Sequence, residues 1–125
     1  MTLRSYLARM ENTLRPRQDY TIEQIVSDTF STDALFRARL RFYDNSTLYV
    51  AEDLESLGRR VIERIEYAFH YQTSDGALIF RYDNSSHYPN LPTFPAHKHT
   101  LDGVIAAEAP DLADVLREID TILYP

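Results

Sequence analysis

The sequence predicts one α+β domain, in which an antiparallel meander β-sheet carries an N-terminal and a C-terminal helix packed on one face. Three observations predict it: apolar residues recur at helical spacing near both ends, they alternate with polar residues in between, and turn motifs separate the alternating stretches. The chain has 125 residues, and 44% of them are hydrophobic, which suffices for one core. We therefore expect residues 1–125 to form a single domain.

The first element is predicted to be a short amphipathic helix that ends before Pro16, because proline cannot continue helical hydrogen bonding. Apolar side chains recur along it at Leu3, Tyr6, Leu7, Met10 and Leu14. A first strand should follow, since Ile22, Val26 and Phe30 fit one face of an extended segment, although Ile25 interrupts that pattern.

The next predicted strand, residues 34–42, is half-buried. Its apolar face holds Ala34, Phe36, Ala38, Leu40 and Phe42, and its other face holds Leu35, Arg37, Arg39 and Arg41. Asp44-Asn45-Ser46 should turn the chain into LYVAEDL, and a three-residue loop would set Phe42 opposite Leu48. The arginine row predicts a solvated face paired with acids such as Asp53, or a guide for a phosphate backbone if it adjoins the histidines described below.

Residues 54–69 fit a helix or a strand by pattern, and the motif Asp75-Gly76 decides between them. It is a strong hairpin signal, and ALIFRYD beyond it is extended, so its partner should be extended from about Glu63. A two-residue loop predicts the pairs Tyr71–Phe80 and Phe69–Tyr82 on the core face, and His70–Arg81 and Ala68–Asp83 on the other.

The last element is predicted to be a helix that starts at Ala109-Pro110-Asp111, where proline and an acid suit a helix N-terminus. Its apolar stripe comprises Leu112, Val115, Leu116, Ile119, Ile122 and Leu123.

The net charge of −6 argues against a general nucleic-acid coat protein. Residues 101–125 carry six acids and Arg117 alone, so they account for −5 and leave the body of the chain nearly neutral. The absence of cysteine excludes disulfides and thiolate chemistry. The charged N-terminus does not resemble a signal peptide, and no stretch has the roughly 20 apolar residues of a membrane span. We therefore expect a cytoplasmic protein that does not enter a membrane.

Three of the four histidines fall in RYDNSSHYPNLPTFPAHKH, residues 81–99. Residues 84–96 should form a long loop that three prolines stiffen; such a loop is either functional or a structural cover for the sheet edge. In an extended segment His97 and His99 project to one side and Lys98 to the other. Imidazoles near Asp83 suit general acid–base chemistry or metal binding. The alternative is that they are surface histidines without a role, which three histidines within thirteen residues disfavour.

The combination of YAFHYQ, Asp75-Gly76, LIFRYDN and FPAHKH resembles the TumE family of toxins from type II toxin–antitoxin systems. The resemblance is closest in the second half of the chain. It implies a growth-inhibiting α+β protein with a cognate helix-turn-helix antitoxin. The positions that match are Arg81, Tyr82, Asp83, Asn84, His87, His97, Lys98 and His99.

The leading hypothesis is a toxin that acts as a metal-independent endoribonuclease without a cofactor. The predicted acid–base residues are His87, His97, His99 and Asp83, the phosphate-binding residues are Arg81 and Lys98, and the supporting residues are His70, Tyr82 and Asn84. One alternative is a metal-binding protein that holds a divalent ion such as zinc with His87, His97, His99 and Asp83. Another is a non-enzymatic module that binds a protein. RNA and the antitoxin are the expected partners, and a homodimer is left open.

Overall fold

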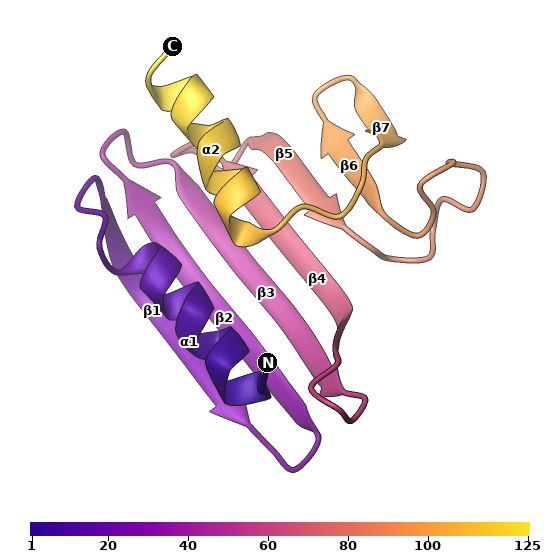
Figure 1. The fold of residues 1–125 in the computed structure, drawn as a ribbon. Coiled ribbons are helices and arrows are strands. Elements are labelled where there is room, and N and C mark those ends of the chain that lie inside the picture. Colours follow the sequence, from indigo (N-terminus) through magenta and orange to yellow (C-terminus); the bar gives the residue numbers. More distant parts are fainter.

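The computed structural model describes residues 1–125 and shows one seven-stranded antiparallel sheet with a helix at each end of the chain (Figure 1). Each strand pairs with the one before it, so the sheet is a meander and the predicted fold class is confirmed. The elements are α1 (Leu3–Leu14), β1 (Tyr20–Thr29), β2 (Asp33–Phe42), β3 (Thr47–Ser56), β4 (Ile62–Gln72), β5 (Leu78–Asp83), β6 (His97–Thr100), β7 (Gly103–Ala106) and α2 (Leu112–Leu123). Neither helix has the length and apolar character needed to cross a membrane.

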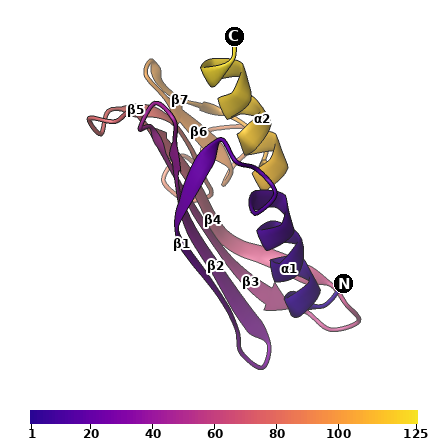
Figure 2. The same ribbon diagram turned by 90° about the vertical axis from the view of Figure 1, so that its left-hand side faces the viewer.

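Both helices lie on the same face of the sheet, as Figure 2 shows edge-on. The core fills the space between them and that face, and its largest members are aromatic: Phe36, Phe42, Phe69, Tyr71 and Phe80. Burial of each such side chain contributes about 1.5–3 kcal/mol to folding. The opposite side of the sheet, which we call the open face, carries Arg37, Arg39, Arg41, Tyr49, Ala51, Ala68, His70, Arg81, Asp83, His97 and His99.

One carboxylate lies in the core. Glu52 of β3 is 1% exposed, and it accepts hydrogen bonds from the Tyr6 hydroxyl at 2.5 Å and from Nη1 of Arg64 at 3.0 Å. Arg64 also donates to the carbonyl of Pro110. This network therefore joins α1, β3, β4 and the segment that leads into α2.

The single face predicted for the first strand is wrong because β1 contains a bulge. The register with β2 shifts between Ile22 and Gln24, and this reverses the alternation beyond that point. Ile22 and Ile25 consequently both pack against the core, whereas Phe30 is 60% exposed. The bulge explains why Ile25 interrupts the sequence pattern.

The β2–β3 turn lies one residue earlier than predicted. Its loop is Tyr43-Asp44-Asn45, the Phe42 N–H donates to the Ser46 carbonyl, and Leu40 pairs with Leu48. Asn45 adopts a φ of 65°, which asparagine tolerates better than most residues. The predicted pair of Phe42 with Leu48 is therefore wrong by two residues, but a shift of two keeps the apolar face intact.

The four predicted β4–β5 pairs are all confirmed. The loop itself has three residues rather than two, since Thr73 N–H donates to the Ala77 carbonyl. Gly76 supplies its left-handed conformation with a φ of 90°. An irregularity between Tyr71 and Gln72 compensates for the extra residue and restores the predicted register.

Candidate functional site

The cross-strand registers gather residues that are distant in sequence into two rows on the open face. The first row, from β2 to β6, is Arg39, Tyr49, His70, Arg81 and His99. The second row is Arg37, Ala51, Ala68, Asp83 and His97. Residues directly opposite each other on neighbouring strands share a face and lie close together. The rows therefore connect the arginines of β2 with the histidines of β6.

A groove of about 760 Å³ lies on the open face where the second row contains two alanines. Ala51 and Ala68 have short side chains, so they form a low floor between Arg37 on one side and Asp83 on the other. The loop after β5 contributes Ser85, Ser86, His87 and Tyr88 to the wall, and β6 contributes His99. The groove is thus a consequence of side-chain size along one row.

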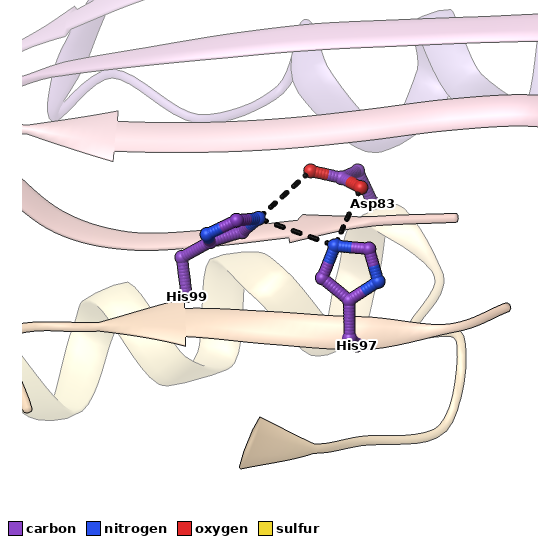
Figure 3. A group of neighbouring side chains, drawn as sticks. All are labelled: Asp83, His97 and His99. Carbon is purple, nitrogen blue, oxygen red and sulfur yellow. Dashed lines mark hydrogen bonds and ion pairs between the residues drawn. The ribbon is translucent and has the colours of Figure 1, made fainter. Parts of the chain in front are cut away.

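Asp83, His97 and His99 converge at the end of β5 and on β6 (Figure 3). Nε2 of His97 lies 2.8 Å from Oδ1 of Asp83, and Nε2 of His99 lies 3.3 Å from Oδ2. The two Nε2 atoms are 3.2 Å apart. These three residues offer ligand atoms that all lie within 4.8 Å of one another.

His97 is 1% exposed and does not reach the groove surface. Its Nδ1–H donates to the Pro95 carbonyl at 2.9 Å, since a carbonyl can only accept. This bond fixes the ring so that Nε2 faces Asp83 and His99. The Tyr88 ring packs against the His97 ring at 4.7 Å between centroids and against the His99 ring at 5.8 Å.

His99 is the imidazole of the cluster that reaches solvent, with 26% of its side chain exposed. Its Nε2 points into the cluster, while its ring edge lines the groove. In Figure 3 its second nitrogen points away from Asp83 and His97. His99 therefore joins a buried carboxylate to the space that a substrate would enter.

The pKa of Asp83 lies below the usual range for a carboxyl group. Burial alone would raise this pKa, but hydrogen bonds outweigh it. The Ser85 backbone N–H donates to Oδ1 at 3.0 Å, and Nε of Arg81 donates to Oδ2 at 2.8 Å. Asp83 is consequently a buried anion at neutral pH.

Arg81 links the cluster to His70. Its Nη1 lies 3.4 Å from Nδ1 of His70, and Nε2 of His70 lies 3.0 Å from Oε1 of Gln72. Because a guanidinium only donates and an amide oxygen only accepts, His70 carries its proton on Nε2. Burial, with the charge of Arg81 acting in the same direction, lowers the pKa of His70. This histidine is therefore a neutral support for Arg81.

Lys98 and Tyr82 do not belong to the site. Both project to the helix-covered face, where Nζ of Lys98 lies 2.6 Å from Oε2 of Glu118 and the Tyr82 hydroxyl donates to Oε1 of the same residue. The strand alternation that places His97 and His99 on the open face puts Lys98 on the other. The structure thus places Lys98 apart from the predicted phosphate-binding residue Arg81, and it places Tyr82 on the core face.

His87 and Asn84 line the groove but stand outside the cluster. His87 is exposed, so three of the four predicted metal ligands converge and this one does not. Asn84 accepts from the Tyr67 N–H and donates to the Ile65 carbonyl. Its amide therefore acts as a structural clamp on the β4 backbone.

Sequence reasoning missed the part that Tyr88 plays in orienting both imidazoles, because its position between His87 and Pro89 reads as a loop anchor. It also missed the Pro95 carbonyl, since backbone acceptors leave no signal in a sequence. The predicted ion pair of Arg37 with Asp53 is confirmed at 2.7 Å.

The cluster has a definite electrostatic requirement. With Nδ1–H of His97 held by the Pro95 carbonyl, a neutral His97 directs a lone pair at Asp83. Lone pairs at such separations repel unless a cation lies between them. A proton shared among the three groups or a bound metal ion would each meet this requirement. The arrangement is thus suited to proton transfer or to metal chemistry.

Comparison with models of known protein families matches residues 11–123 to the family described as toxin TumE. Comparison with curated proteins and with solved structures gives no match. The matched region contains all seven strands, α2 and the Asp83–His97–His99 cluster. It also covers the second-half motifs in which the sequence resembles that family. The chain therefore belongs to the TumE toxin family.

Proposed function

We propose that this protein is the toxin of a toxin–antitoxin pair and acts as a metal-independent endoribonuclease in the groove beside His99. One observation carries the proposal: a partly exposed imidazole in a groove contacts a buried carboxylate, and a guanidinium is bound to that same carboxylate. RNA supplies its own nucleophile, the 2′-hydroxyl, so cleavage requires only proton transfer and stabilisation of the phosphorane charge.

In the proposed reaction His99 accepts the proton of the 2′-hydroxyl as this oxygen attacks phosphorus. The bond from phosphorus to the 5′-oxygen breaks, and the leaving oxygen takes a proton from His87, the other imidazole that lines the groove. A 2′,3′-cyclic phosphate and a 5′-hydroxyl result. Asp83 orients His99 and stabilises its protonated form. His97 is too deeply buried to touch RNA, so it acts as a positioning residue for Asp83 and His99.

Arg81 is the proposed phosphate ligand. Its Nε is held by Asp83 and its Nη1 lies near His70, which leaves Nη2 without a partner in the protein. The side chain is 38% exposed. A guanidinium fixed in this way requires little reorganisation to bind the phosphorane oxygens.

The test is cleavage of single-stranded RNA by the purified protein, together with growth after induction. His99→Ala is expected to abolish both cleavage and growth inhibition. Val104→Ala, at the position opposite His99 on β7, serves as the matched control and should retain both. Growth inhibition without any change in cellular RNA would contradict the proposal and favour a module that acts by binding a protein.

The family suggests an antitoxin partner, and we propose that it is the helix-turn-helix protein implied by the sequence resemblance. Co-expression of the protein encoded by the neighbouring reading frame should restore growth, and that protein should copurify with the toxin. Size-exclusion chromatography of the toxin alone would test the homodimer.

The ligand-atom separations favour a second candidate function, metal binding. A tetrahedral site with bonds of 2.0–2.1 Å holds its ligand atoms about 3.3 Å apart. The two Nε2 atoms are 3.2 Å apart, and each lies within 3.3 Å of one oxygen of Asp83, Oδ1 for His97 and Oδ2 for His99. Two imidazoles and a carboxylate beside a groove resemble the ligand set of catalytic zinc or iron sites. Bound, such an ion would supply Lewis acidity beside the groove.

Elemental analysis of untagged protein separates the two candidates. Cleavage that persists in EDTA, with less than stoichiometric metal, supports the acid–base site. Cleavage that EDTA abolishes and one divalent metal restores supports the metal site and contradicts the metal-independent reaction.

A further inference from the structure

The first row of the open face runs across the sheet from Arg39 to His99. Its Arg81 and His99 line the groove, so the row leads from the groove to β2. Along it, Tyr49 lies opposite Arg39 on one side and His70 on the other. Tyr49 is 41% exposed, and its ring meets the His70 ring edge-on at 6.2 Å. From β2 to β6 the row spans about 19 Å, because neighbouring strands lie about 4.8 Å apart. This is long enough for a few nucleotides beside the proposed cleavage site.

Charge on the open face distinguishes the two directions in which a strand of RNA could leave His99. Near the β2 end of the row, Arg39 and Arg41 share the one carboxylate of Glu23, with separations of 3.4 and 3.0 Å. One positive charge therefore remains uncompensated there. In the other direction, along the strands, Arg37 pairs with Asp53, and the carboxylates of Asp33, Glu55 and Glu66 remain without an ion-pair partner. A polyanion is attracted to the first direction and repelled by the second.

The guanidinium groups at that end are also accessible. The side chains of Arg39 and Arg41 are each 42% exposed. Nε of Arg39, the atom nearest Glu23, is itself enclosed and makes no hydrogen bond, so the accessible part is the rest of this side chain. An exposed aromatic ring beside arginines is the combination that binds single-stranded nucleic acid, since bases stack on the ring and phosphates bind the cations.

We propose that single-stranded RNA crosses the sheet at right angles to the strands, with a base stacked on Tyr49 and phosphates bound by Arg39 and Arg41. This inference rests on the proposed function, because it extends the substrate path from the site at His99. Tyr49 is then a specificity residue that selects unpaired RNA, since a base inside a duplex has no free face to stack.

The experiment measures binding of a short fluorescent 2′-O-methyl RNA, which lacks the nucleophile and stays intact, by anisotropy over a range of salt concentrations. Tyr49→Ala is expected to weaken binding about tenfold, and Tyr49→Phe, which keeps the ring, should bind like the unaltered protein. Arg39→Gln and Arg41→Gln should each lower the slope of log affinity against log salt by about 0.7.

Two matched control variants each delete a similar side chain, a tyrosine ring or an arginine charge, at a position outside the row. Tyr43→Ala deletes a ring that is 63% exposed in the β2–β3 turn, and Arg15→Gln deletes a charge that is 55% exposed after α1. Both should bind the oligonucleotide like the unaltered protein. Circular dichroism melting curves establish that each variant is folded.

The outcomes separate this inference from the proposed function. If the Tyr49 and arginine variants bind like the controls, the path across the sheet is wrong, even when unmodified RNA is cleaved. If they bind weakly as expected and unmodified RNA is not cleaved, the path stands and the nuclease proposal fails. If the unaltered protein does not bind the oligonucleotide at low salt, the inference is overturned, and the result favours binding of a protein partner by this row.

Discussion

At the scale of single residues, the histidines of the site differ chiefly in burial. His97 is enclosed and anchored to a backbone carbonyl, whereas His99 combines a buried contact with an exposed edge. The sequence places both on one side of a strand and gives no reason to distinguish them. In the proposed reaction this difference in burial gives them different roles: His97 holds the geometry, and His99 contacts the substrate.

Replacement of each histidine by alanine tests this difference. His97→Ala removes a buried ring and its bond to the Pro95 carbonyl, and it should lower the free energy of unfolding by about 1–3 kcal/mol. His99→Ala should lower it by less than about 1 kcal/mol, because the side chain is partly exposed. Urea unfolding measures both values. Equal losses in the two variants would contradict the assigned roles, whatever their activities.

The lowered pKa of Asp83 predicts how stability depends on pH. A carboxyl group with a lower pKa in the folded protein stabilises it above the unfolded value of about 3.9, and this stabilisation is lost as pH falls through the folded pKa. Asp83→Asn should therefore be less stable than the unaltered protein at pH 7, and the difference should shrink below about pH 4. Urea unfolding at pH 7, 5 and 3.5 tests this. The exposed Asp102→Asn is the control and should show no such trend.

At the scale of elements, hairpins and strand alternation position the site, while a buried network fixes the helices over the other face. Strand alternation alone separates Lys98 from its neighbouring histidines. Glu52 is the centre of the network, since it binds Tyr6 of α1 and Arg64 of β4. Removal of one partner from a buried ion pair leaves an uncompensated charge.

Glu52→Ala should lower the free energy of unfolding by about 2–4 kcal/mol, because Arg64, whose side chain is only 19% exposed, would lose its carboxylate and Tyr6 its acceptor. Glu52→Gln keeps a hydrogen-bond acceptor, and its free energy of unfolding should lie between those of Glu52→Ala and the unaltered protein. Glu66→Ala, which replaces an exposed residue on the next strand, should change the free energy of unfolding by no more than about 0.5 kcal/mol. Denaturant titration measures all three. An equal effect at Glu52 and Glu66 would show that the network contributes nothing to stability.

At the scale of the whole molecule, the sheet is covered on one side and the site occupies the other, toward the end where the strands are short. β2, β3 and β4 have ten or eleven residues and are paired on both sides, whereas β6 and β7 have four each. Two of the three residues in the Asp83–His97–His99 cluster thus lie on one of the two shortest strands.

Amide hydrogen exchange should reflect this gradient. Exchange is expected to be slowest in β3 and fastest among the strands in β6 and β7, because short terminal strands open locally at lower cost. Binding of a 2′-O-methyl RNA should slow exchange in β6. Mass spectrometry of peptic peptides measures both effects. Equal protection of β3 and β7 would refute the gradient.

Much of the fold was determined by the sequence alone. Alternation in residues 34–42, helical spacing at the two ends and the Asp75-Gly76 turn predicted the α+β meander and all four β4–β5 pairs. These signals are local, since period and turn chemistry act over a few residues. The bulge in β1 and the exact β2–β3 loop escaped prediction, because a single inserted or shifted residue depends on packing against the neighbouring strand.

The composition of the site was determined only in part. The sequence identified Arg81, Asp83 and the histidines, but it grouped Lys98 with them and treated His97 and His99 alike. Tertiary structure decided which groups converge, which histidine of the cluster reaches the groove, and that two alanines lie in its floor. The physical reason is that burial and convergence are set by what lies across the sheet, and contacts between distant strands leave no periodic signal in the chain.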